Sequence, residues 1–205
     1  MKVGPKYKIA KRLGPSVFEK TQTQKFAIAA ERSERNRGRK RGPTEYGRQL
    51  LEKQKVRITY GLSEKQFSAY VAAAMKTHAT AEITPSDVLH RLLELRLDNV
   101  VYRLGLAPTR RAARQMVSHG HITIDGRKTT IPSRQVHVGD VIGIRAGSAS
   151  LPLYENYATR FAEMSLPQWL TWDVKKMQGG VSGMPSTESV SPAGDLISVL
   201  SFYSR

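Results

Sequence analysis

Two neighbouring stretches decide the fold of this chain: RLDNVVYRLG at residues 96–105 and TRRAARQMVSHGHITIDGR at residues 109–127. Apolar residues recur at helical spacing through both, in one helix expected to begin at Thr84–Asp87 and another capped by Thr109. The apolar residues that follow alternate, which is typical of strands. Two helices followed by short strands predict a small α+β module over residues 94–149.

The expected strands are short and joined by tight turns at Asp125–Gly126 and Gly139–Asp140. They cover residues 121–124, 128–131, 136–138 and 141–144. Arg127 and Lys128 follow Gly126, where the backbone could approach a phosphate closely. An ordinary surface hairpin explains that turn equally well.

Helical patterns flank the module on both sides. Thr44 is placed to cap one helix, and Ser63 with Gln66 forms a capping box for the next. Helical spacing returns at residues 154–162, and a last apolar run covers residues 196–203. We therefore expect a mostly helical domain, interrupted by the module, that comprises residues 45–93 and 150–205.

The chain is strongly basic, with 205 residues and a formal net charge of +16. Such a surplus indicates a polyanionic partner through long-range attraction and counterion release, although a basic protein without a specific partner is the alternative. Residues 1–44 hold 13 Lys and Arg against 3 Asp and Glu. We expect them to form an extended basic N-terminal arm, largely disordered until it meets the polyanion.

Several kinds of protein and site are disfavoured. The chain has no cysteine, which excludes disulfides and thiolate metal sites. No stretch approaches the roughly 18–20 apolar residues of a membrane span, and the start lacks the apolar core of a secretory signal. A cytoplasmic or organelle-interior location is therefore expected.

The search for catalytic groups is also negative. His119 and His121 make a poor metal pair without a carboxylate or thiol nearby. The sequence contains no glycine-rich nucleotide loop and no convincing pair of acids. We expect no enzyme activity, no cofactor and no metal.

Polar residues on the two helices of the module favour nucleic-acid binding. Their spacings of three, four and seven residues place several on shared helical faces, and guanidinium groups bind phosphates and stack on bases. The residues expected to form one guanidinium patch are Arg96, Asn99, Arg103, Arg110, Arg111, Arg114, Gln115 and His119. A solvated basic face and a DNA-reading helix-turn-helix are the alternatives. The strands that follow favour a reader of RNA shape.

The two stretches closely resemble the RNA-binding module of the family of bacterial-type small ribosomal subunit protein four. The resemblance extends to the start MKVGPKYKIAKRLG, to YGRQLLEKQKVRITYG at 46–61, to EKQFSAY at 64–70, to PQWLTWDVKKMQG at 167–179 and to the ending FYSR. The module also occurs in pseudouridine synthases, a class of tRNA synthetases and small heat-shock RNA binders. Motifs in register along nearly the whole chain are more specific than the module alone.

The resemblance implies a structural protein that binds the 5′ domain of 16S-type rRNA early, nucleates subunit assembly and contributes to translational accuracy. The guanidinium patch would face rRNA, as would Arg127 and Lys128. The other implied rRNA-binding residues are Tyr46, Arg48, Lys53, Lys55 and Arg57 in a second contact, and Lys2, Lys6, Lys8, Lys11 and Arg12 in the arm. Arg37, Arg39, Lys40 and Arg41 would lie where mRNA enters. The implied protein partners are small-subunit proteins three and five.

One departure from the family and several alternatives complete the interpretation. Some members hold zinc with cysteines in the arm, so here rRNA and packing must fix it. Repression of its own messenger by the same surface is a second hypothesis. An RNA-modifying enzyme is a third, but the paired acid or nucleophile that it needs is missing. Bacterial and organellar ribosomes both fit.

Overall fold

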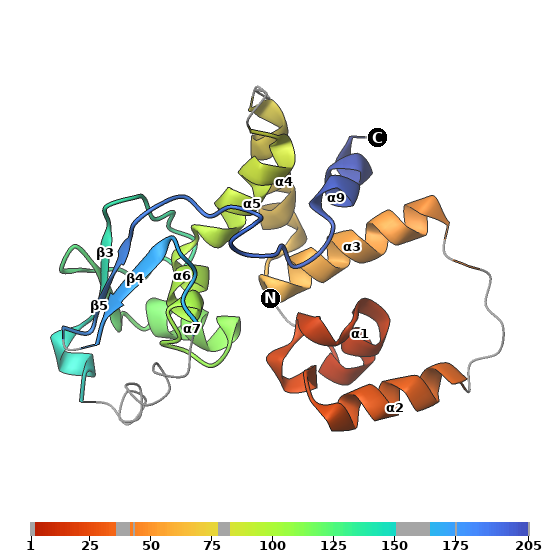
Figure 1. Ribbon diagram of the computed structural model, residues 1–205, viewed down its shortest axis with the longest axis horizontal. Helices are drawn as coiled ribbons and strands as arrows, with labels where there is room; N and C mark the ends of the chain where they lie inside the picture. The colour runs from red at the N-terminus through yellow and green to blue at the C-terminus, as the bar shows by residue number, and fades with distance from the viewer. Residues whose placement is uncertain are drawn as a thin grey trace. The chain divides into compact units, whose positions relative to one another are not determined.

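The computed structural model describes residues 3–35, 42, 44–77, 83–150, 165–174 and 176–204, and the chain forms two compact units (Figure 1). The helical unit comprises Met1–Leu89 and Pro192–Arg205, and the sheet unit comprises His90–Ser191. Helices combined with an antiparallel sheet confirm the α+β class. Within the described ranges, no helix combines the length and apolar character needed to cross a membrane.

Two helices of the helical unit begin at the predicted caps. The hydroxyl of Thr44 accepts a hydrogen bond from the first turn of α3 (Glu45–Thr59). Ser63 and Gln66 form the capping box of α4 (Glu64–Lys76). Each such pair satisfies backbone N–H groups that a helix start leaves without partners. The buried face of α4 consists of Phe67, Val71 and Ala74.

The C-terminal helix α9 (Leu196–Tyr203) returns to this unit (Figure 1). Asp195 caps α9 by accepting hydrogen bonds from the first-turn N–H groups of Ile197 and Ser198. The N–H of Asp195 also donates to Glu52 of α3 at 2.9 Å, across 143 residues of sequence. The helix α9 therefore belongs to the helical unit, although the sheet unit separates it from α3 and α4 in the sequence.

The N-terminal segment is folded over residues 6–35. It forms α1 (Lys6–Leu13), the 3-10 turns η1 (Pro15–Val17) and η2 (Glu19–Thr21), and α2 (Gln24–Arg35). Ala10, Val17, Phe18 and Phe26 are buried together. The Thr21 hydroxyl is also buried, 2.8 Å from two backbone carbonyl oxygens of the same segment. The expectation of a largely disordered arm is wrong for these residues, because four apolar side chains and one buried hydroxyl close a small core.

The sheet unit contains five antiparallel strands in the order β2-β1-β3-β5-β4. The strands are β1 (Ile122–Ile124), β2 (Arg127–Lys128), β3 (Val141–Ile144), β4 (Leu170–Asp173) and β5 (Gln178–Val181). Apolar side chains of the strands share one core with α6 (Leu97–Arg103) and α7 (Arg110–Ser118). The expected strand at 136–138 does not form, and the one expected at 128–131 shortens to β2.

Strands β4 and β5 come from the segment that was expected to join the helical domain. Trp169, Leu170, Val181 and Val190 lie in the core of the sheet unit, so the predicted domain division is wrong for residues 165–191. The glycine-rich sequence of β5 resembles a loop, but the sheet requires it. A Cβ on Gly179 would lie 2.6 Å from the backbone oxygen of Thr171. The helix expected at 154–162 falls outside the described residues.

The helix expected to run to Gly105 is interrupted. It divides into α5 (Pro85–Glu94) and α6, because Arg96 takes an extended conformation and bridges Gln135. The N–H of Leu97 donates to the carbonyl of Arg134 at 2.9 Å. This break carries Arg96 away from the helical face that it was expected to share with the residues of α6.

Candidate nucleic-acid interface

The centre of the predicted guanidinium patch is a buried ionic network. Arg96 is 1% exposed and donates to Asp98 through Nε (3.0 Å) and Nη2 (2.7 Å). Asp98 is 4% exposed and also accepts from Nε of Arg114 at 3.0 Å. One internal carboxylate therefore holds an arginine from before α6 and another from α7.

A second buried carboxylate, that of Glu94, binds other side chains of the network. Glu94 is 0% exposed and binds Arg103 through two hydrogen bonds of 2.9 and 2.8 Å. It also accepts from the side-chain amide of Asn99 at 2.8 Å. The oxygen of that amide accepts from Nε of Arg110 at 2.8 Å. Arg110 additionally lies over the Tyr102 ring at 4.4 Å, a cation–π contact that fixes the plane of the guanidinium.

Three guanidinium groups thus reach the surface from fixed positions: Arg103, Arg110 and Arg114, here called the arginine array. The side chains of Arg103 and Arg114 are 22% and 29% exposed, and Arg110 is also partly exposed. Each is held from its inner side by a carboxylate or an amide. An arginine side chain ordered in this way loses less conformational entropy when it binds a phosphate.

The β1–β2 hairpin brings further cations to the end of α7. Gly120 has φ +73, and a Cβ there would lie 2.2 Å from Cε of Lys128, so the lysine stem crosses the glycine. The rings of His119 and His121 are 6.0 Å apart, and His121 contacts the Ser148 hydroxyl at 2.9 Å. These contacts place polar and cationic groups of the hairpin beside the end of α7.

The predicted second contact, on α3, is a mixture of surface and interior residues. Lys53 is 7% exposed, binds Glu64 at 2.6 Å and lies over the rings of Phe202 and Tyr203. Arg57 pairs with the same Glu64 at 3.3 Å. Lys53 and Arg57 therefore help to hold α9 and α4 against α3.

The carboxylate of Glu64 is the electrostatic centre of this contact. Burial alone would raise the pKa of Glu64, but hydrogen bonds from Lys53 and Tyr203, with the charges of Lys53 and Arg57, hold that pKa below its usual range. Burial and the hydrogen bond to Glu64 raise the pKa of the Tyr203 phenol. The pair is thus most stable as an anionic acid and a neutral phenol.

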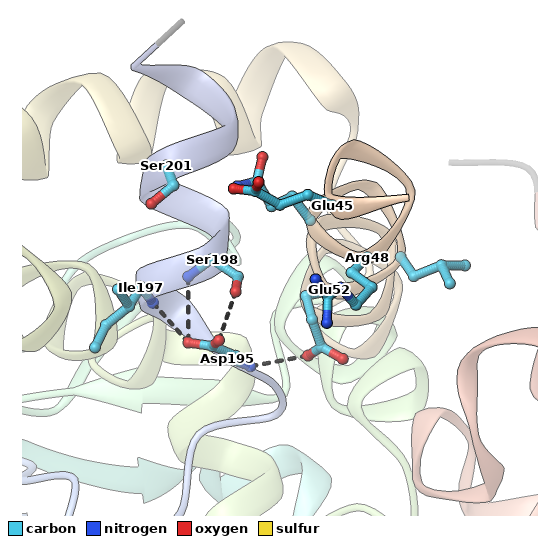
Figure 2. A pocket seen from close by; sticks show the side chains of 9 residues that line it. Glu45, Arg48, Glu52, Asp195, Ile197, Ser198 and Ser201 are labelled. Carbon is cyan, nitrogen blue, oxygen red and sulfur yellow. Dashed lines mark hydrogen bonds between the residues drawn. The ribbon is translucent and has the colours of Figure 1, made fainter. Parts of the chain in front are cut away.

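A hollow of about 540 Å³ lies between α3 and α9 (Figure 2). The acids Glu45, Glu52 and Asp195 line it with Arg48. Gln49 also lines it and is 7% exposed, and its amide oxygen has no hydrogen-bond partner among the described residues. An excess of acids and a buried acceptor suit a cationic donor better than a phosphate.

Two family profiles match adjacent parts of the chain and together cover residues 2–142. The profile described as ribosomal protein S4/S9 N-terminal domain matches residues 2–94, and the S4 domain matches residues 95–142. Small ribosomal subunit protein uS4 of Herpetosiphon aurantiacus is 41% identical over 98% of both chains. The uS4 protein of Akkermansia muciniphila is 40% identical over 98% of both chains. That of Porphyromonas gingivalis is 42% identical over 91% of this chain and 90% of its own.

The chain belongs to the uS4 family. The predicted resemblance is therefore confirmed, and the family is one of structural ribosomal proteins rather than enzymes. The uS4 relatives are named small ribosomal subunit proteins. The S4 domain includes most of the buried network and the whole of α7.

The structure of this uS4 chain corrects part of the predicted patch. Arg96 and Asn99 are 1% and 2% exposed, so they support the arginine array from inside and do not face a ligand directly. Arg111, Gln115 and His119 are exposed along α7 or at its end, as Arg127 and Lys128 are on the hairpin. They remain predicted RNA contacts.

The predicted rRNA contacts on α3 and α1 also include both buried and exposed residues. Lys53 is interior, which corrects its predicted rRNA contact, whereas Tyr46 and Arg48 are exposed and Lys55 pairs with Glu52 at 3.6 Å. On α1, Lys8 and Arg12 are exposed, Lys6 and Lys11 are partly exposed, and Lys6 lies 5.9 Å from the Phe18 ring. Lys2, Arg37, Arg39, Lys40 and Arg41 lie outside the described residues.

Three residues at or beside the candidate interface were not predicted from the sequence: Glu94, Asp98 and Arg145. Asp98 lies within the stretch 96–105 and Glu94 lies two residues before it, but a search for clustered cations does not detect acids. Arg145 is exposed, and its N–H donates to the carbonyl of His121 at 2.9 Å. The position of Arg145 directly after the expected strand 141–144 is the sequence feature that could have identified it as a surface cation. In the described ranges, no cluster of three acids or histidines could hold a metal ion.

Proposed function

We propose that this uS4 chain is a primary rRNA-binding protein that binds the 5′ domain of the small-subunit rRNA and nucleates subunit assembly. The observation that carries the proposal is the arginine array, whose three guanidinium groups come from α6 and α7 and are fixed from within. Groups fixed in this way can match phosphates at set spacings in folded RNA. The formal net charge of +16 supplies the long-range attraction.

Binding of the full chain to a transcript of the 5′ domain tests this proposal. The affinity should fall steeply as salt rises, because cations displaced from the RNA are released on binding. Arg103→Ala with Arg114→Ala should weaken binding by roughly 2–5 kcal/mol, the sum of two charge-assisted contacts. An unchanged footprint of the double variant on the transcript would remove the arginine array from the interface.

We propose that the hollow between α3 and α9 receives a cationic side chain of a neighbouring protein, with small-subunit proteins three and five as the expected partners. Its acids and the buried Gln49 oxygen support this contact. Because the chain has no cysteine, Ser201→Cys places a unique thiol in the hollow. That thiol should crosslink to a protein in reconstituted subunits. Ser118→Cys on α7, which should be covered by RNA, is the control and should not.

We also propose that Arg37, Arg39, Lys40 and Arg41 lie where mRNA enters the subunit and contribute there to translational accuracy. Four cations within five positions support a contact with a polyanion. Replacing all four by Gln should reduce crosslinking of mRNA to this chain in assembled subunits. Binding to the 5′-domain transcript should be much less affected, since the arginine array is intact. Equal loss of both would assign these residues to rRNA.

A further inference from the structure

Two acids occupy an unexpected place in a protein that binds a polyanion. Glu94 and Asp98 are 0% and 4% exposed and lie directly beneath the arginine array. Long-range electrostatics alone would make each of them unfavourable for binding, because each subtracts one charge from the surface that attracts phosphate. Their contacts give the opposite expectation.

Glu94 controls two of the three guanidinium groups in the array. It holds Arg103 directly by two hydrogen bonds, and it holds Arg110 through Asn99. Asp98 holds Arg114 and is itself held by Arg96. Every member of the array is therefore anchored, directly or through one amide, to a carboxylate that is closed to solvent.

We propose that Glu94 is a positioning residue for RNA binding, which increases the affinity for RNA by fixing Arg103 and Arg110 although its own charge opposes the ligand. The inference rests on the proposed function, since it assumes that the arginine array contacts RNA. Asp98 acts in the same way on Arg114. A flexible arginine must lose rotamer freedom when it binds, whereas these side chains are ordered beforehand.

The sign of one substitution separates positioning from simple charge. Glu94→Gln removes a negative charge and keeps the shape of the side chain, so a charge effect alone would strengthen RNA binding. Positioning predicts that affinity for the 5′-domain transcript falls by about tenfold, the effect of one misplaced charge-assisted contact. The matched control is Glu188→Gln, an exposed acid of the same unit. It should leave the affinity unchanged or up to about twofold tighter.

A double-mutant cycle tests whether Glu94 acts through the arginines. In the background Arg103→Ala with Arg110→Ala, Glu94→Gln should no longer weaken binding, because the groups that it positions are gone. Because the bonds between Glu94 and Arg103 also stabilise the fold, affinities are compared only where every variant is fully folded. The urea midpoint of each variant, followed by tryptophan fluorescence, identifies any loss of folded protein.

Arg103→Lys provides a test that leaves the buried carboxylate in place. Lysine keeps the positive charge but cannot form the two hydrogen bonds that Glu94 makes with a guanidinium. Positioning predicts that Arg103→Lys binds RNA nearly as weakly as Arg103→Ala, and with a similarly reduced dependence on salt. Affinity close to that of the unmodified chain would overturn the proposal even if Glu94→Gln fails to fold.

The possible failures are distinguishable. If Arg103→Ala with Arg110→Ala binds the transcript as tightly as the unmodified chain, the assignment of the RNA surface is wrong. If that variant binds weakly while Glu94→Gln binds as tightly as Glu188→Gln, the RNA surface stands and the positioning role is overturned. We expect that Glu94→Gln lowers the affinity in the unmodified chain. We expect no such fall in the background Arg103→Ala with Arg110→Ala.

Discussion

Arg96→Ala should destabilise the sheet unit rather than remove an RNA contact. The substitution deletes hydrogen bonds of 3.0 and 2.7 Å to Asp98, whose side chain is 6% exposed. Removal of one partner from a buried ion pair costs about 3–5 kcal/mol. Asp98 keeps Arg114 at 3.0 Å, so we expect the lower end, about 3 kcal/mol. For a unit of about 100 residues this lowers the melting temperature by roughly 12–24 °C.

The positions of the two tryptophans make the measurement specific. Trp169 and Trp172 are the only tryptophans of the sequence, and both belong to the sheet unit. Urea unfolding followed by tryptophan fluorescence therefore reports this unit alone. Arg111→Ala, on the exposed side of α7, is the control and should change stability by less than about 0.5 kcal/mol.

The refuting result is equally clear. If Arg96→Ala leaves the urea midpoint unchanged and weakens binding to the 5′-domain transcript as much as Arg103→Ala does, then Arg96 contacts RNA and its burial has no structural role. The binding measurement must be made well below the unfolding transition, so that loss of folded protein does not imitate loss of affinity.

Three further predictions concern packing, pH and a helix start. Gly179→Ala should destabilise the sheet unit by about 1–3 kcal/mol or more, because the new methyl group meets the oxygen of Thr171; an unchanged tryptophan-monitored midpoint would contradict it. The Glu64–Tyr203 pair should stabilise the helical unit fully between the ordinary pKa of a carboxyl and that of a phenol. This stability should be lost as pH falls through the lowered pKa of Glu64 and as it rises toward the raised pKa of Tyr203. Circular dichroism melts across pH measure this, and Tyr203→Phe should remove the alkaline loss. Ser63→Ala should cost about 1 kcal/mol in the same melts by removing the cap of α4, and a cost near zero would show that the cap is dispensable.

Local signals in the sequence predict the helix starts well. The caps at Thr44 and Ser63 form as expected, because a cap depends on residues three positions apart. The break at Arg96 was missed for the converse reason. It is made by backbone hydrogen bonds to residues near Gln135, almost forty positions away, and the apolar spacing continues through it undisturbed.

Charge patterns have a similar limit at the candidate site. They identify where cations concentrate, and Arg103, Arg110 and Arg114 do lie together. They do not distinguish an arginine that faces solvent from one that neutralises a buried acid. Arg96 lies two positions before Asp98, and that proximity was the available sign that its charge is satisfied internally. Likewise, the glycines of β5 concealed a strand, because only the completed sheet explains them.

The return of α9 to the helical unit determines the order in which the chain can finish folding. As the chain emerges during its own synthesis, α3 and α4 appear early, but the helix that covers them follows only after the sheet unit. All of His90–Ser191 is made in the interval, so the later unit can reach its final form before the earlier one. A product cut before Asp195 would combine a finished sheet unit with an uncovered α3.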